Sequence, residues 1–366
     1  MNEKIQNTTG MEAINNILDN AVSAGASDIH CDPRDKDVFI RFRIDGIIVG
    51  GDRYDKRIHE EMIARLKILS GARTDIHAIP QDGRWQANIL GQVYNIRISF
   101  MPTYYGENAV LRILPVKQAG QMSFAKLGFT PEQVGKIDCA LHKTSGLILV
   151  TGPTGSGKTT TLYTCLSLKA KEPISIITLE DPIEYEIEGL RQVHVKHSHG
   201  VTFASGLRAS LRQDPDVIMV GEIRDNETAR IAIHTALTGH LVFSTLHTNS
   251  AIEAIPRLID MGIDHYLLAS TLKLIISQRL VRTICRECFA EGCDACRGSG
   301  YSGRVVVSEI CEVDSGLRDL ISRKESLSVC HDYIMKKGFR SLNDDGMEKV
   351  EWGITSRGEL SRVFSE

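Results

Sequence analysis

The sequence lacks several features that would place it in a specialised class. No apolar run approaches the roughly 18–20 residues that a membrane-spanning helix needs, and residues 1–10 lack the apolar core of a signal peptide. We find no internal repeat, no low-complexity tract and no basic tract interleaved with aromatics, and the net charge is −3. These absences favour a soluble cytoplasmic protein that does not bind nucleic acid or span a membrane.

At 366 residues the chain is long for one domain. We expect residues 1–114 to form a small α/β domain on an antiparallel-rich sheet, because two amphipathic helices alternate with short strand patterns. The Asp45-Gly46 pair predicts a hairpin turn. The expected helices are 11–24, ended by Gly25, and 57–70, and the expected strands are 38–44, 47–49, 84–90, 93–99 and 108–114.

Residues 115–123 contain turn-formers and no periodicity, which predicts a linker. Residues 124–366 form the expected second domain. Its short apolar strands alternate with helices, which is typical of a parallel sheet covered on both faces. The expected strands are 147–151, 174–179, 217–220, 241–245 and 303–310, and the later helices are 249–260, 265–277, 314–322, 326–337, 343–351 and 356–365.

A glycine-rich segment follows the apolar run 147–150 and has the spacing G-x4-G-K-[ST] of a P-loop. Its glycines let the backbone wrap a phosphate chain, and the helix that follows adds its positive dipole end. Lys158 can reach the β- and γ-phosphates and Thr159 can bind Mg²⁺. A turn without a ligand is the alternative. The expected nucleotide-binding residues are Gly152, Pro153, Thr154, Gly155, Ser156, Gly157, Lys158, Thr159 and Thr160.

Two further apolar strands end in carboxylates. Val217–Val220 runs into Gly221-Glu222, the Walker B pattern, where Glu222 can help to orient Mg²⁺ and take a proton from the attacking water. A second strand ends in Glu180, Asp181 and Glu184, which we expect at the metal or at the attacking water. Solvated acids at strand ends are the alternative in both cases.

His240 and His247 stand at the two ends of one apolar strand. A histidine here can sense the γ-phosphate through a hydrogen bond, although a structural role is the alternative. Four of the nine cysteines form two C-x-x-C pairs that can supply four thiolates to a tetrahedral Zn²⁺. Metal-free thiols are the alternative. These cysteines are Cys285, Cys288, Cys293 and Cys296.

Taken together, the motifs resemble those of the secretion ATPase superfamily, the motors of type II secretion and type IV pilus assembly. The resemblance runs from about Ser27 to the C-terminus. Its segments are 27–30, 41–46, 80–84, 95–99, 106–112, the P-loop, 180–184 (similar to the Asp box), 207–216, 221–225 (the Walker B box) and 238–249 (the His box).

The resemblance implies a RecA-like motor domain preceded by a PAS-like α/β domain, assembled into a homohexamer that hydrolyses ATP with Mg²⁺. It implies that arginines matching Arg97, Arg112 and Arg208 reach a nucleotide bound across a domain or subunit boundary. It also implies work at the inner membrane with a platform protein of a pilus or secretion system.

Within that superfamily the paired cysteines are similar to those of the assembly and secretion branch, and retraction ATPases generally lack them. The family's pairs stand farther apart than Cys288 and Cys293 do here. Only about 25 residues precede Ser27, so we expect a compact member without the extra N-terminal docking domain. A retraction motor, a nucleic-acid translocase and a non-catalytic nucleotide-binding ring are the alternatives.

Overall fold

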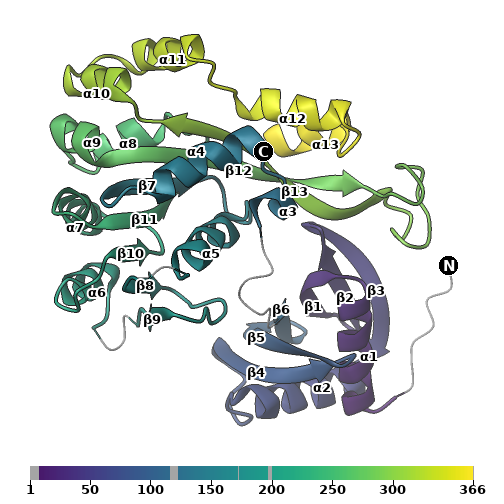
Figure 1. Cartoon of the computed structure of the whole chain (residues 1–366). Helices are drawn as coiled ribbons and strands as arrows, with labels where there is room; N and C mark the ends of the chain where they lie inside the picture. Colours follow the sequence, from purple (N-terminus) through teal and green to yellow (C-terminus); the bar gives the residue numbers. More distant parts are fainter. Residues whose placement is uncertain (1–7, 116–122, 172, 197–199, 366) are drawn as a thin grey trace. The chain divides into compact units, whose positions relative to one another are not determined.

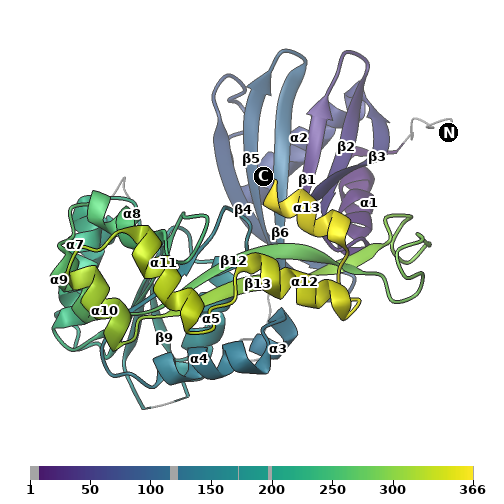
Figure 2. The ribbon, with the colours of Figure 1, turned by 90° about the horizontal axis from the view of Figure 1, so that it is seen from above.

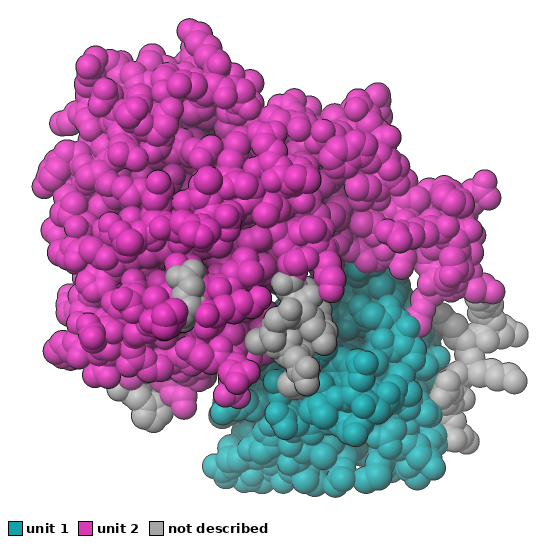
Figure 3. Space-filling model, in the orientation of Figure 1, with its two compact units in different colours: residues 1–117 teal, residues 118–366 magenta. Residues whose placement is uncertain are grey.

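The computed structural model describes residues 8–115, 123–171, 173–196 and 200–365. The chain divides into two compact units, residues 1–117 and 118–366 (Figure 3). The expected linker, 115–123, falls almost wholly on residues 116–122, which lie outside the described residues. Among the helices of the described ranges, none is both long and apolar enough to cross a membrane.

The first unit is one six-stranded sheet with two helices on one face (Figure 2). Every neighbouring pair of strands is antiparallel, in the order β3-β2-β1-β6-β5-β4. The turn between β2 and β3 is Asp45-Gly46, both with positive φ, as the sequence predicts. The elements are α1 (Gly10–Ser23), β1 (Ala26–Pro33), β2 (Asp37–Ile44), β3 (Ile47–Asp55), α2 (Lys56–Ser70), β4 (Gln81–Ile89), β5 (Gln92–Thr103) and β6 (Gly106–Pro115).

Burial in this unit follows the alternation along its strands. In β2, Val38, Ile40 and Phe42 are buried, whereas Phe39 and Arg41 between them are partly exposed. The buried set packs against the apolar faces of α1 and α2 in one core. The opposite face of the sheet carries the arginines of β2, β5 and β6 together with partly exposed apolar residues such as Phe39 and Val110.

The second unit is built on a seven-stranded sheet in the order β13-β12-β7-β11-β10-β8-β9 (Figure 1). All neighbouring pairs are parallel except β12 and β13. Its strands are β7 (Gly146–Thr151), β8 (Ile176–Glu180), β9 (Leu190–His194), β10 (Val217–Val220), β11 (Leu241–Leu246), β12 (Leu272–Ile284) and β13 (Tyr301–Glu312). Its helices are α3 (Phe124–Leu127), α4 (Pro131–Leu141), α5 (Lys158–Lys169), α6 (Phe203–Ser210), α7 (Asn226–Leu237), α8 (Ala254–Asp260), α9 (His265–Thr271), α10 (Ser315–Ser322), α11 (Leu327–Lys336), α12 (Leu342–Glu351) and α13 (Arg357–Phe364).

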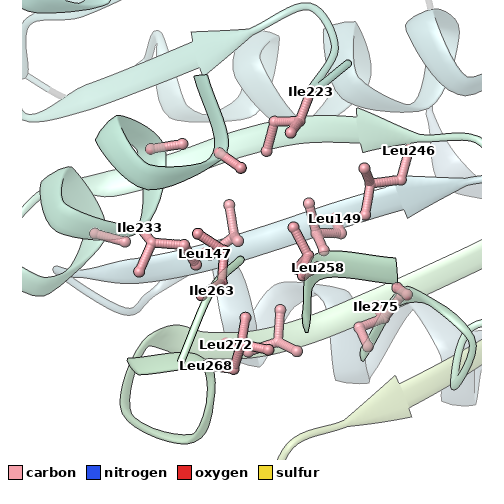
Figure 4. Packing of buried hydrophobic residues seen from close by; sticks show 14 of the residues in the cluster. Leu147, Leu149, Ile223, Ile233, Leu246, Leu258, Ile263, Leu268, Leu272 and Ile275 are labelled. Carbon is pink, nitrogen blue, oxygen red and sulfur yellow. The ribbon is translucent and has the colours of Figure 1, made fainter. Parts of the chain in front are cut away.

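Helices cover both faces of this sheet, as predicted. Successive residues of β7 point to opposite faces, so Leu147 and Leu149 join one core while Ile148 and Val150 join another. The first core packs against α6 to α11, and the second packs against α3, α4 and α5. Figure 4 shows part of the first core, with Ile233 of α7, Leu258 of α8 and Leu268 of α9 against the sheet. A smaller apolar cluster packs α12 and α13 against the β12–β13 pair.

Three expectations about the elements are wrong or incomplete. The helix expected at 265–277 ends at Thr271, and the chain continues as β12, whose residues Leu274 to Gln278 are all buried. A strand buried on both faces shows no alternation, so its apolar residues fit the spacing of a helix equally well. The strands β1 and β9 are also absent from the expected elements. The strand β12 places two residues of the site described next.

Candidate active site

The P-loop joins β7 to α5 and depends on its glycines. Gly152, Gly155 and Gly157 all have positive φ, which disfavours any other residue. A side chain at Gly152 would also meet the carbonyl oxygen of Gln278, because an added Cβ would lie 2.5 Å from it. Gly157 is the N-cap of α5, and among the described residues no side chain caps this helix end. The backbone N–H groups of the first turn are therefore available to an anion.

Lys158 lies in the first turn of α5 and folds back over the loop. Its Nζ donates hydrogen bonds to the carbonyl oxygens of Gly152, at 2.8 Å, and of Pro153, at 2.9 Å. Burial lowers the pKa of Lys158 to about 8, an effect that Glu222 opposes and that Arg279 reinforces. At pH 7 the ammonium is still largely protonated.

The hydroxyls around the loop have different environments. Thr159 is exposed at the start of α5, where its hydroxyl can reach a metal ion, and Thr160 follows it. Ser156 Oγ and Thr151 Oγ1 are buried and have no hydrogen-bond partner among the described residues. Buried hydroxyls without partners are uncommon, so we expect a ligand or water to supply the missing hydrogen bonds at this loop.

Glu222 follows β10, and the sheet holds it in place. The flanking N–H of Gly221 donates to the carbonyl of Leu179 at 2.8 Å, and the N–H of Ile223 donates to the carbonyl of Thr245 at 3.1 Å. The carboxylate is mostly buried and pairs with the guanidinium of Arg224 at 2.6 Å. Because β11 lies between β7 and β10, the ends of these three strands bring the P-loop, His247 and Glu222 together.

The two histidines lie at opposite ends of β11. His247 follows the strand, and its Nε2 lies 3.7 Å from Glu222 Oε2. Burial and then the charge of Lys158 lower the pKa of His247, so the ring is neutral at pH 7. His240 precedes the strand, and its Nδ1 lies 3.2 Å from the carbonyl of Thr235 at the end of α7. The geometry therefore places His247, but not His240, beside the strand-end carboxylate.

Glu180 ends β8 and is buried, with hydrogen bonds to both oxygens. Oε2 accepts the hydroxyl of Tyr163, and Oε1 accepts Thr178 Oγ1 at 2.5 Å and Gln192 Nε2 at 3.1 Å. The hydroxyl of Tyr163 also accepts the N–H of Glu184 at 3.2 Å, whereas Asp181 is exposed. The acidic segment is thus fixed to α5 through Tyr163.

Sequence reasoning missed two residues of β12 that contact the P-loop region. Gln278 is fully buried and donates from Nε2 to the carbonyl of Ser156 at 2.7 Å. Arg279 donates from Nη2 to the carbonyl of Asn249 at 3.1 Å, in the loop that follows β11. Gln278 and Arg279 belong to no recognised motif, and they follow directly on the segment 265–277, for which a helix was expected. A helix there gives no reason to expect a strand that brings these two residues beside the P-loop.

The four paired cysteines form the connection between β12 and β13. Their sulfur atoms all lie within 4.8 Å of one another, and three of the separations are 3.6, 3.7 and 3.9 Å. Four sulfurs at the tetrahedral corners around one Zn²⁺ stand about 3.8 Å apart, since each Zn–S bond is about 2.3 Å. The N–H groups of Cys293 and Gly300 each donate to Cys296 Sγ at 3.2 Å. The cluster could bind zinc.

Comparison with known proteins identifies the family. The model of the family described as Type II/IV secretion system protein matches residues 4–362. The chain belongs to this family. The Type II secretion system protein HxcR of Pseudomonas aeruginosa is 41% identical over 358 residues, which cover 96% of this chain and 76% of that protein. The Type II secretion system ATPase E of Vibrio cholerae is 41% identical over 385 residues, which cover 97% and 75%.

Solved structures agree with this membership. The pilus retraction motor PilT, solved with bound ADP, is 29% identical with a TM-score of 0.68 over 94% of this chain and 95% of that one. The ATPase DotB of Legionella pneumophila has a TM-score of 0.77 over 100% of this chain and 98% of that one, and at 23% identity it shows the fold alone. The predictions of a secretion ATPase, of ATP as its nucleotide and of a RecA-like α/β motor fold are confirmed.

The arginines that the secretion ATPase resemblance singled out lie in both units. In the first, Arg97 of β5 and Arg112 of β6 are directly paired across the strands, and Arg84 of β4 is the opposite neighbour of Arg97. Directly paired residues share a face, so the three form a row across the sheet. Arg84 ends the resemblance segment 80–84 but is not among the predicted site arginines. Arg112 Nε donates to Asp28 Oδ1 at 2.8 Å. In the second unit, Arg208 of α6 pairs with Glu227 at 2.5 Å.

Proposed function

We propose that this secretion ATPase is a Mg²⁺-dependent homohexamer that hydrolyses ATP to drive assembly of a type II secretion pseudopilus or a type IV pilus at the inner membrane. The observation that carries the proposal is the meeting of Lys158, His247 and Glu222 at the ends of β7, β11 and β10. A phosphate-binding loop beside a strand-end carboxylate is the arrangement that water attack on a γ-phosphate requires.

The residues divide the work as follows. Lys158 and the loop N–H groups bind the β- and γ-phosphates, and Thr159 binds Mg²⁺. Glu222 accepts the proton of the attacking water, Arg224 holds its carboxylate in place, and the neutral ring of His247 lies beside it, where it can contact the γ-phosphate. A Mg²⁺ ion held at this site would neutralise charge that develops on the phosphates.

The acidic segment 180–184 supports this metal site. Both oxygens of Glu180 already accept hydrogen bonds, so Glu180 acts by fixing the segment to Tyr163 and leaves direct contact with the metal or its waters to Asp181 and Glu184. Arg97, Arg112 and Arg208 reach a nucleotide across a domain or subunit boundary, where a guanidinium from a mobile neighbour couples hydrolysis to movement.

Phosphate release from ATP tests the activity. Lys158→Ala should abolish turnover and nucleotide binding, whereas Glu222→Gln should retain binding and lower kcat by at least about 100-fold. Glu351→Gln, a charge removal at an exposed position of α12, is the matched control and should turn over like the wild type. Full turnover by Lys158→Ala would contradict the assignment of the site.

The oligomer and the arginines are tested together. Light scattering of the purified chain with ATP and Mg²⁺ should give the mass of six copies. Arg97→Ala, Arg112→Ala and Arg208→Ala should each lower kcat while the affinity of the P-loop for ADP stays within about twofold, because these side chains act from another domain or subunit. Unchanged kcat in all three variants would refute the shared site.

We also propose that the cysteine cluster holds a structural Zn²⁺. The supporting observation is the spacing of its four sulfur atoms, which is that of a tetrahedral thiolate site. Metal analysis of the purified chain should find one zinc per chain, and Cys288→Ser with Cys293→Ser should lose it. Cys139→Ser, at an exposed cysteine outside the cluster, should keep it.

One observation favours a second candidate, a retraction motor, because the pilus retraction motor PilT shares 29% identity and the fold. The secretion relatives share 41% identity over nearly the whole chain, and we therefore favour assembly. A deletion strain separates the two: loss of pili or of secretion supports assembly, and accumulation of pili supports retraction.

A further inference from the structure

The buried side chain of Gln278 spans two parts of the phosphate site. Its Nε2 donates to the carbonyl of Ser156 in the P-loop at 2.7 Å, and its Oε1 accepts the hydroxyl of Thr161, in α5, at 2.8 Å. Gln278 and Thr161 are both fully buried, so neither bond can be replaced by solvent. One amide group thus fixes the loop to the helix that follows it.

The contact determines which way one loop N–H group points. A trans peptide is planar, with its C=O and N–H pointing in opposite directions. Because the carbonyl of Ser156 is held toward Gln278, the N–H of the same peptide, which belongs to Gly157, is turned away from β12. The glycines at the two ends of the loop also lie against this residue: an added Cβ would stand 2.5 Å from Gln278 O at Gly152 and 3.1 Å from Gln278 Nε2 at Gly157.

We propose that Gln278 is a positioning residue that holds the P-loop in its phosphate-binding shape before nucleotide arrives. The inference rests on the proposed binding of nucleotide at the P-loop. Without the hydrogen bond from Gln278, the peptide between Ser156 and Gly157 can rotate. Part of the binding free energy of the nucleotide is then spent on ordering this peptide. Gln278 removes that cost, and the gain appears in affinity for the phosphate groups.

Gln278→Met tests the brace, because methionine has a similar size and cannot donate a hydrogen bond. We expect the Kd for ADP and the KM for ATP to rise about tenfold, with kcat changed less than about twofold, as for a loss of ground-state binding. Gln278→Glu should weaken binding as strongly, because it keeps an acceptor for Thr161 but loses the donor to Ser156. Thr161→Val should cost less than about threefold, since the donor remains.

Gln133→Met is the matched control. Gln133 is also buried, and its Nε2 donates to the carbonyl of Ser308 at 3.2 Å and to Asp345 at 3.1 Å, away from the loop. It should lower Tm as Gln278→Met does and leave the Kd for ADP unchanged. If Gln278→Met does not fold, Gln278→Glu against Gln133→Met decides the question.

The outcomes separate this inference from the proposed function. Wild-type protein that neither binds ADP nor hydrolyses ATP would refute the function. Wild-type binding together with unchanged Kd and KM in Gln278→Met or Gln278→Glu would refute the brace alone. A rise in Kd that Gln133→Met shows to the same degree would also overturn it, since the loss would then follow general destabilisation.

Discussion

Raising the pH should weaken nucleotide binding through Lys158. The ammonium donates to two loop carbonyls, and burial lowers its pKa to about 8. A lysine with this pKa is about three quarters protonated at pH 7.5 and about one tenth protonated at pH 9. A bound phosphate requires the protonated form and restores a high pKa in the complex.

The size of the effect follows from proton linkage. If only the protonated form binds, affinity for ADP falls about eightfold between pH 7.5 and pH 9, or about 1.2 kcal/mol. Binding at pH 9 then takes up about 0.9 proton per ADP, against about 0.25 at pH 7.5. The neighbouring His247 does not contribute, because its pKa lies below the ordinary value and the ring is neutral throughout this window.

Isothermal titration with ADP, without divalent metal and in two buffers of different ionisation enthalpy, measures both quantities. Lys158→Arg is the control, since arginine stays charged and its affinity should not vary over the same range. An affinity that is constant from pH 7.5 to pH 9 in the wild type, or that falls equally in Lys158→Arg, would refute the reasoning.

Three other predictions concern stability, measured by urea denaturation. Lys67→Met should cost about 3 kcal/mol, because it removes the lysine cation 2.7 Å from the buried Glu107 and leaves that carboxylate only the ring of His77, and Glu107→Gln in the same chain should recover part of the loss. Tyr163→Phe should cost about 1.5–3 kcal/mol, because buried Glu180 loses a hydroxyl donor. Burial would raise the pKa of Glu359, but hydrogen bonds from two arginines outweigh it and lower the pKa to about 2. Stability from this carboxylate is therefore complete above about pH 5 and lost as the pH falls toward 2, and Glu359→Gln should flatten that dependence.

The parts of the site predicted from the sequence are those whose chemistry is local in the chain. The P-loop follows its strand directly, and the strand patterns before Glu222 and around His247 are short apolar runs that end in polar residues. Parallel strands bring such ends to one edge of a sheet, so their meeting could be expected. The roles of these residues in catalysis stay predictions.

The missed parts depend on contacts between distant segments. Gln278 contacts Ser156 only because β12 lies beside β7, and the apolar spacing of Leu272 to Ile276 fits a helix as well as a strand. The sequence likewise shows Glu180 only as one of three neighbouring acids. It does not show that the hydroxyl of Tyr163, in α5, donates a hydrogen bond to one oxygen of Glu180. Register between strands, which pairs Arg84 with Arg97, is also invisible until the sheet is assembled.

The position of β7 in its sheet bears on how the chain is made. β7 ends at Thr151, but its two neighbours, β11 and β12, begin only at Leu241 and Leu272. During synthesis the strand that leads into the P-loop therefore has both edges unpaired until β11 is added, and its second edge stays unpaired until β12, more than a hundred residues after Thr151, is added. Gln278 is among the last residues needed to shape the loop. A nascent chain therefore completes its phosphate site only when its motor sheet is nearly complete, because the contact between Gln278 and Ser156 spans 122 residues of sequence.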